Sequence, residues 1–201
     1  MRSIRALLLL LVATPAVLAR AEPWPPSIAL PVVGSATTMA GWVDFCLRHE
    51  GECPRGARKP VVIRLDGRIE RMIDAVNRHV NGTVAARSDA DHWGVTDRWD
   101  LPTDRLGDCE DFVLQKRKLL IENGLPRQAL HVTVVYYGKN EGHAVLLVRT
   151  DRGDYVLDHL AEEIRPWCDT PYRYVKRQSD GDPDVWVSLY GSSEHPLCRG
   201  R

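Results

Sequence analysis

The sequence has no internal repeat, no low-complexity tract and no heptad pattern of a coiled coil. Beyond its first residues, it also has no apolar run long enough to span a bilayer. With 44% apolar and 27% charged residues, the composition is that of an ordinary globular protein. A chain of 201 residues suffices for one domain with a hydrophobic core and is short for two.

An excess of charge is also missing, because 27 basic residues balance 27 acidic ones. If residues 1–21 are removed, Arg2, Arg5 and Arg20 go with them, which leaves 24 basic against 27 acidic residues and a formal charge of −3. No basic stripe remains, and this argues against nucleic acid as a partner.

The first 21 residues have the order of a secretory signal peptide. A basic start, residues 1–5, precedes the apolar run 6–13, and small residues at Ala19 and Ala21 suit a cleavage site. We expect residues 1–21 to be a signal peptide, residues 22–201 to form a single domain, and the mature protein to be periplasmic. An uncleaved N-terminal anchor is the alternative.

An odd number of cysteines in an exported chain suggests disulfides and one unpaired thiol. Cys46 and Cys53 are close enough for a local bridge, and Cys168 with Cys198 would close a second loop, although the sequence does not establish that pairing. Cys109 is then left over. The cysteine spacings match no CxxC-type zinc site.

The apolar pattern predicts helices in the first half of the chain and strands in the second. Helices are expected over about 38–48, from an Asp66 N-cap to about Val80, and from Cys109 or Glu110 to Asn123. Strands are expected over 132–137, 143–150, 155–158, 172–176 and 185–189. This order predicts an α+β fold, with N-terminal helices packed on an antiparallel β-sheet.

Cys109 is predicted to begin a helix directly after Gly107-Asp108. The free N–H groups and the dipole of a helix start stabilise a thiolate, and the same N–H groups can hold an oxyanion during acyl transfer. A lone cysteine is more often a buried structural residue. The presence of a suitable histidine and aspartate favours a catalytic nucleophile here.

His143 opens a predicted strand after Gly142, and Asp158 ends the strand that follows it. A hairpin joins the two strands, so the carboxylate can reach the imidazole and fix its tautomer. The imidazole would take the proton of the thiol and return it to the leaving group. We therefore predict a catalytic triad of Cys109, His143 and Asp158. Taken alone, His143 would more simply be interpreted as a residue that caps a hairpin and Asp158 as one that forms a turn.

The acidic residues next to Cys109 oppose ionisation of its thiol, because like charges raise a thiol pKa. A hard cation would cancel this effect, and carboxylate oxygens suit Ca²⁺. We therefore predict a calcium site that uses Asp108 and Glu110. The alternative is that Glu110 and Asp111 are only favourable charges in the first turn of a helix.

The same motifs resemble the bacterial transglutaminase-like cysteine proteinases, including their LapG-type periplasmic members. The similarity covers about residues 38–190 and several separated motifs fall in the family's order: 93–99, 107–120, 142–145, 153–158, Trp167, 172–174 and 177–179. It implies a papain-like/transglutaminase-like core, in which Cys109, His143 and Asp158 match the triad and Asp108 and Glu110 match calcium ligands.

The LapG-type members cleave large surface repeat adhesins near the N-terminus, at a di-alanine site, and so release cells from biofilms. A c-di-GMP-responsive inner-membrane receptor sequesters them. The resemblance thus implies a protein substrate and such a receptor as partner. Two other functions stay open: a transglutaminase-type acyl transferase, in which an amine replaces water, and a binding module of the same fold without catalysis.

Overall fold

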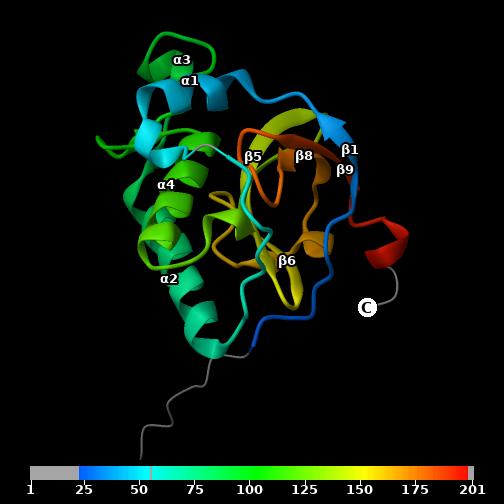
Figure 1. The fold of residues 1–201 in the computed structure, drawn as a ribbon. Helices are drawn as coiled ribbons and strands as arrows, with labels where there is room; N and C mark the ends of the chain where they lie inside the picture. Colours follow the sequence, from blue (N-terminus) through cyan, green and yellow to red (C-terminus); the bar gives the residue numbers. More distant parts are fainter. Residues whose placement is uncertain (1–22, 55, 199–201) are drawn as a thin grey trace, which may run out of the picture.

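The computed structural model describes residues 23–54 and 56–198. The predicted signal peptide, residues 1–21, therefore lies outside the described residues. The described chain has helices on one side and a sheet on the other (Figure 1). Within the described ranges, none of the helices combines the length and apolarity that a bilayer crossing requires.

Four α-helices form the first half: α1 (Ala40–Arg48), α2 (Gly67–Thr83), α3 (Asp89–His92) and α4 (Cys109–Glu122). The Asp66 side chain accepts hydrogen bonds from Arg68 N and Ile69 N, both at 2.9 Å, so the predicted N-cap of α2 is confirmed. Short 3₁₀ turns lie at Glu50–Glu52, Arg127–Ala129, Trp167–Asp169 and Pro196–Cys198.

One seven-stranded sheet has the spatial order β1-β9-β8-β4-β5-β6-β7, with antiparallel pairs throughout. Its strands are β1 (Val32–Ala36), β4 (Leu130–Tyr137), β5 (Glu141–Thr150), β6 (Gly153–Leu157), β7 (Arg165–Pro166), β8 (Arg173–Gln178) and β9 (Trp186–Gly191). A separate parallel pair joins β2 (Ala85–Ala86) to β3 (Leu106–Gly107) and fixes the chain just before α4.

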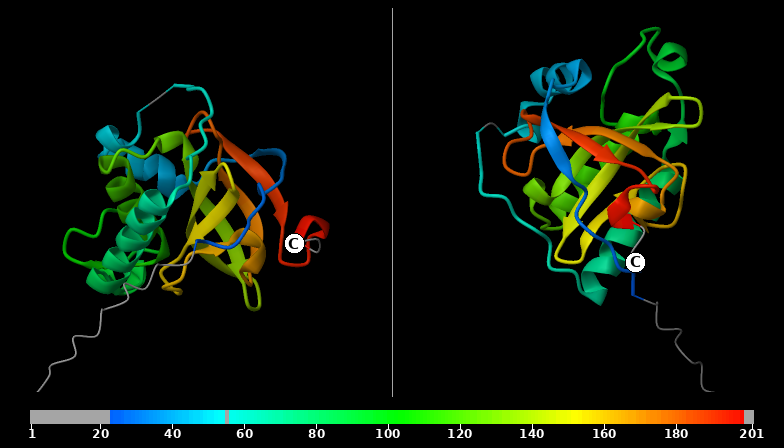
Figure 2. Two further views of the ribbon diagram at one scale, coloured as in Figure 1. Left: turned by 90° about the horizontal axis from the view of Figure 1, so that it is seen from below. Right: turned by 90° about the vertical axis from the view of Figure 1, so that its right-hand side faces the viewer.

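The sheet is buried on both faces, as the alternation along β5 shows. Ala144, Leu146 and Val148 belong to a large core shared with α1, α2 and α4, whereas Val145 and Leu147 belong to a second core with Trp167 and Tyr174. Helix α4 packs directly on β4 and β5, and α2 packs on α4 (Figure 2). Among the α-helices of the described chain, the one that begins at Cys109 has the largest share of buried residues.

The observed fold confirms the α+β class and adds details that the sequence did not predict. Strand β1 precedes the helices and pairs with β9, so the first strand of the sheet lies ahead of α1 in the chain. Helix α2 continues to Thr83 instead of ending near Val80 as predicted. The Asn81 side chain donates to the backbone oxygens of Asp158 and Ala161, so tertiary contacts favour the extra turn.

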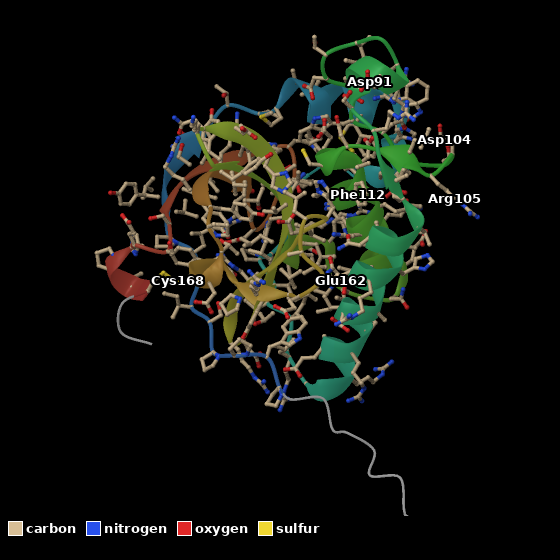
Figure 3. The ribbon with its side chains drawn as sticks, turned by 180° about the vertical axis from the view of Figure 1, so that it is seen from behind. Asp91, Asp104, Arg105, Phe112, Glu162 and Cys168 are labelled. Atoms are coloured by element: carbon tan, nitrogen blue, oxygen red, sulfur yellow. A yellow bond between two sulfur atoms is a disulfide. The ribbon has the colours of Figure 1, made fainter. Side chains whose placement is uncertain are left out.

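Both expected disulfides are present in the structure. Cys46 bonds to Cys53 across seven residues, and Cys168 bonds to Cys198 across thirty. Cys168 lies beside the C-terminal 3₁₀ turn (Figure 3), and this bond ties that turn to the 3₁₀ turn Trp167–Asp169. Cys109 is the free cysteine of the described chain.

Candidate active site

Cys109 is the first residue of α4, and Asp108 is its N-cap. The thiol donates a hydrogen bond to Glu110 Oε2 at 3.0 Å, and it also interacts with the backbone of Ala144, the residue after His143. Burial raises the pKa of the thiol, the negative charge of Glu110 raises it further, and the contact with Ala144 acts in the opposite direction. The helix start thus holds the sulfur against β5 in its protonated form.

His143 and Asp158 form a buried hydrogen-bonded pair. His143 Nε2 lies 2.9 Å from Asp158 Oδ1, and both side chains are 3% exposed. The same carboxylate accepts from the Tyr172 hydroxyl and from Leu160 N at 3.1 Å. Burial by itself would raise the pKa of Asp158, but the hydrogen bonds from His143 and Tyr172 outweigh it and lower the pKa to about 2. The carboxylate is therefore ionised throughout the neutral range.

The sheet register explains why these two residues meet. Leu146 pairs with Leu157 in the β5–β6 hairpin, which puts Asp158 next to the end of β5 where His143 lies. Residues on neighbouring strands at such diagonal positions lie within reach of long side chains. Tyr137, at the end of β4, packs edge-on against the His143 ring at 5.5 Å between ring centroids. The imidazole is thus held from the sheet side as well as by its carboxylate.

Cys109, the third predicted residue of the triad, lies beside this pair but is not hydrogen-bonded to it. Cys109 donates to Glu110 rather than to His143, and the Nδ1 atom of His143 is the ring nitrogen left after Nε2 has bonded to Asp158. The sulfur and the pair are nevertheless close in the structure, because the thiol interacts with the backbone of Ala144, which directly follows His143 in β5. The structure therefore brings the three predicted residues to one region.

A surface cavity of about 560 Å³ opens next to the pair. Tyr137 and Tyr172, which flank the His143 ring, are two of its walls. The others come from α2 and from the segments around β7: Arg78, Leu160, Ala161, Glu162, Glu163, Arg165 and Pro171. An extended peptide segment would find here both apolar and charged contacts.

On the other side of Cys109, five carboxylates converge. Ligand atoms of Asp89, Asp97 and Glu110 lie within 4.8 Å of one another, and so do those of Asp89, Asp108 and Asp111. Asp108 and Glu110 were predicted from the sequence, and Asp89 links the two groups. The structure thus surrounds the predicted ligands with carboxylates that come from α3, from the loop after it and from α4.

The electrostatics of this cluster fit a divalent cation. Asp89 Oδ1 and Asp108 Oδ1 are buried, and each lacks a hydrogen-bond partner among the described residues. Burial and the charge of Asp108 raise the pKa of Glu110, and burial raises the pKa of Asp111 to about 8. Buried carboxylates that repel one another and have unpartnered oxygens are a suitable donor set for Ca²⁺, which prefers oxygen ligands.

Asp111 also has a structural task within the cluster. Its Oδ1 accepts from Asp100 N at 2.7 Å and its Oδ2 accepts from Asp108 N at 3.3 Å, so it ties the preceding loop to the start of α4. Gly107 makes this possible, because a Cβ there would lie 2.6 Å from Asp111 Oδ2. The glycine of the Gly-Asp-Cys motif is thus required by close packing.

Three neighbours of the site were not predicted from the sequence: Asp89, Asp97 and Tyr172. Asp97 lies in the motif 93–99 that carries the family resemblance, but the spacing gives no reason to assign it a ligand role. Asp89 lies in the one-turn helix α3, and Tyr172 lies just before β8, so both reach the site only through tertiary packing. Local sequence patterns do not predict contacts of this kind.

A helix that starts at a free cysteine and packs on an antiparallel sheet carrying a histidine–aspartate pair is the layout of a transglutaminase-like core. The model of the family "Bacterial transglutaminase-like cysteine proteinase" matches residues 32–194. The chain belongs to this family of cysteine proteinases.

Solved structures of Legionella pneumophila LapG have the same fold. The calcium-bound form is 24% identical over 63% of this chain and 74% of that one, with a TM-score of 0.52. A second LapG structure covers 59% and 68% with a TM-score of 0.51, and the EGTA-treated form covers 65% and 75% with 0.50, both at 24% identity. No curated protein sequence matches the chain.

Proposed function

We propose that this protein is a periplasmic, calcium-dependent cysteine endopeptidase with Cys109 as nucleophile, His143 as base and Asp158 as orienting carboxylate. The observation that carries the proposal is the buried 2.9 Å hydrogen bond between His143 and Asp158, adjacent to a free cysteine at a helix start. Membership of a cysteine proteinase family supports the same chemistry.

In the proposed reaction, His143 Nδ1 takes the thiol proton while Nε2 stays bonded to Asp158. The sulfur attacks the carbonyl carbon of the scissile peptide bond, and backbone N–H groups at the start of α4 hold the oxyanion. His143 then gives its proton to the leaving amine, which departs and leaves a thioester. Water, activated by the same imidazole, releases the acid and restores the thiol.

We propose Asp108 and Glu110 as calcium ligands, with Asp89 and Asp97 as further oxygen donors from the same cluster. A bound Ca²⁺ would offset the negative charges beside Cys109 and so favour ionisation of its thiol. This proposal is supported by the unpartnered oxygens of Asp89 and Asp108 and by the calcium-bound form of the similar LapG structure.

The proposed substrate is the N-terminal region of a large surface adhesin, whose cleavage would release cells from a biofilm. A c-di-GMP-responsive inner-membrane receptor is the proposed regulator. Both proposals rest on the resemblance to LapG-type proteases. The cavity lined by Tyr137 and Tyr172 beside His143 is the site where we place the peptide.

The test is cleavage by the purified chain 22–201 of the adhesin encoded nearest to its own gene, supplied as an N-terminal fragment. We expect one cleavage in Ca²⁺, no cleavage in EGTA, and none by Cys109→Ala under either condition. Cleavage that persists in excess EGTA would remove calcium from the function, and cleavage by Cys109→Ala would remove the nucleophile. Incorporation of a labelled amine in place of hydrolysis would indicate acyl transfer.

A further inference from the structure

Lys116 lies on the buried face of α4, seven residues and about two helical turns after Cys109. Its side chain is fully buried, with 0% exposure. Among the described residues its Nζ atom has no hydrogen-bond partner, and Lys116 takes part in no ion pair. The neighbouring Lys118 is the contrast on the same helix, because its ammonium pairs with Glu52 and Glu122 near the surface.

Stability does not explain a lysine at this position. An unpaired ammonium in a protein interior costs free energy, and an apolar side chain of similar length removes that cost. The surroundings are suited to such a replacement, since the flanking residues Val113 and Leu120 of α4 are both buried in the main core. A residue that opposes stability in this way is expected at a functional site.

The segment just after β6 lies next to Lys116. The negative charge of Asp158 acts on the ammonium, and the ammonium in turn acts on His159, which stacks on Phe112 of α4 at 4.7 Å. From the other side, α2 holds the same segment: Asn81 Nδ2 donates to Asp158 O at 2.9 Å. Phe112 on α4 is labelled in Figure 3.

Besides His143 and Lys116, the basic side chain next to Asp158 in the described chain is His159, whose Nδ1 lies 3.8 Å from Asp158 Oδ1. Burial lowers the pKa of His159 to about 4, so its imidazole is neutral near neutral pH and does not replace the ammonium. The carboxylate accepts from the neutral Tyr172 hydroxyl and Leu160 N, and from His143. From α2 come Asn77 and Asn81, both uncharged, each with a buried Oδ1 that lacks a partner. Lys116 is thus the buried lysine whose ammonium acts on the aspartate of the histidine–aspartate pair, and it is not among the residues that line the cavity.

We propose that Lys116 is a positioning residue of the candidate active site, whose buried positive charge holds the Asp158 carboxylate in place for His143 and limits the proton affinity of that imidazole. The proposal rests on the proposed function, in which His143 is the base. A nearby cation stabilises the ionised aspartate and disfavours the imidazolium. Burial lowers the pKa of Lys116 to about 7 against the attraction of Asp158, so the charge is present on the acidic side of neutrality.

The first arm of the test compares Lys116→Met with Lys118→Met, the same substitution on the same helix. For Lys116→Met we expect kcat to fall at least about tenfold with KM changed less than about twofold. We also expect its melting temperature to be equal to or above that of the wild type, because an unpaired buried charge has gone. Lys118→Met should keep wild-type kcat.

The second arm needs no catalytic turnover. In Cys109→Ala protein labelled at histidine, NMR titration between pH 4 and pH 8 gives the pKa of His143 with and without Lys116→Met. We expect Lys116→Met to raise it by about one pH unit. A purely structural lysine would leave this pKa where it was. If the wild type shows no peptidase activity, the proposed function fails while this titration still tests the lysine.

Several outcomes would overturn the proposal. One is an unshifted His143 titration in Lys116→Met, and another is an equal loss of kcat in Lys118→Met. If Lys116→Met does not fold, Lys116→Gln is measured in its place, since its side chain is uncharged but keeps a hydrogen-bonding group. Failure of both variants to fold would show that the lysine supports structure and not the imidazole.

Discussion

Asp158 shows how one carboxyl group links the site to the stability of the fold. Its pKa is lowered to about 2, from an ordinary value of 3.8, mainly because the bonds from His143 and Tyr172 outweigh burial. A lowered pKa in the folded state gives stability that is present above pH 4 and is lost as the pH falls towards 2. Asp158 therefore remains ionised over any pH range in which a histidine base would work.

We predict that Asp158→Asn removes this acid-dependent stability. The wild type should lose about 2 kcal/mol of unfolding free energy relative to the variant between pH 4 and pH 2. Urea unfolding at pH 4, 3 and 2 measures the difference between the two proteins. A difference that stays constant with pH would show that the carboxylate has no special bond in the folded state.

The three residues of the candidate active site could be predicted from the sequence, whereas their wider surroundings could not. Cys109, His143 and Asp158 stand at the start of a helix and at the ends of two paired strands, positions that periodicity and turn residues reveal. Asp89, Tyr172 and Lys116 depend on which elements pack together. The buried state of Lys116 in particular runs against the usual exposure of lysine.

At the scale of elements, the start of α4 depends on a close contact at Gly107. A methyl group there would meet the Asp111 carboxylate at 2.6 Å, and that carboxylate joins the loop at Asp100 to the helix. We predict that Gly107→Ala lowers the unfolding free energy by about 1–3 kcal/mol and weakens calcium binding. Gly34→Ala is the control, because a Cβ at Gly34 meets nothing within 4 Å. Equal effects of the two substitutions in chemical unfolding would contradict the packing argument.

The acidic cluster gives a second prediction at this scale. Ca²⁺ at one hundred times its dissociation constant should stabilise the protein by about 2.7 kcal/mol, and EGTA should reverse the effect. Asp89→Asn should abolish the stabilisation, since Asp89 belongs to both carboxylate groups. Asp104→Asn is the matched control. Asp104 lies on the loop after α3 (Figure 3), where it bonds to His92, and it is outside both carboxylate groups. Thermal melts with Ca²⁺ or EGTA provide the measurement, and a calcium response that survives in Asp89→Asn would contradict the assignment.

The order of the elements was largely accessible from the sequence because each has its own signal. Asp66 caps α2, Gly124 follows α4, and apolar alternation marks β4 and β5. Strand β1 has no such signal, since Val32–Ala36 is mostly exposed and is a strand only because it pairs with β9. The last turn of α2 likewise depends on Asn81 and its contacts with the segment after β6.

At the scale of the whole molecule, two disulfides of different span stabilise different regions. Cys46–Cys53 closes a loop of seven residues at the end of α1. Cys168–Cys198 closes a loop of thirty and joins the C-terminal turn to the 3₁₀ turn Trp167–Asp169. We predict that replacing Cys168 and Cys198 by alanine costs about 1 kcal/mol more than replacing Cys46 and Cys53, because the longer loop restricts the unfolded chain more. Urea unfolding of the two double variants gives the comparison, and an inverted order would contradict it.

Denatured, unreduced protein should titrate as one thiol per chain.

The proposed mechanism requires that Cys109 and His143 act together, and this cooperation can be measured without knowing a substrate. The measurement is the rate of alkylation of Cys109 by iodoacetamide at pH 6 in Ca²⁺, for the wild type and for His143→Ala. We predict that the wild type reacts at least about tenfold faster, because the imidazole accepts the thiol proton. Equal rates for the two folded proteins would contradict the proposed catalytic triad.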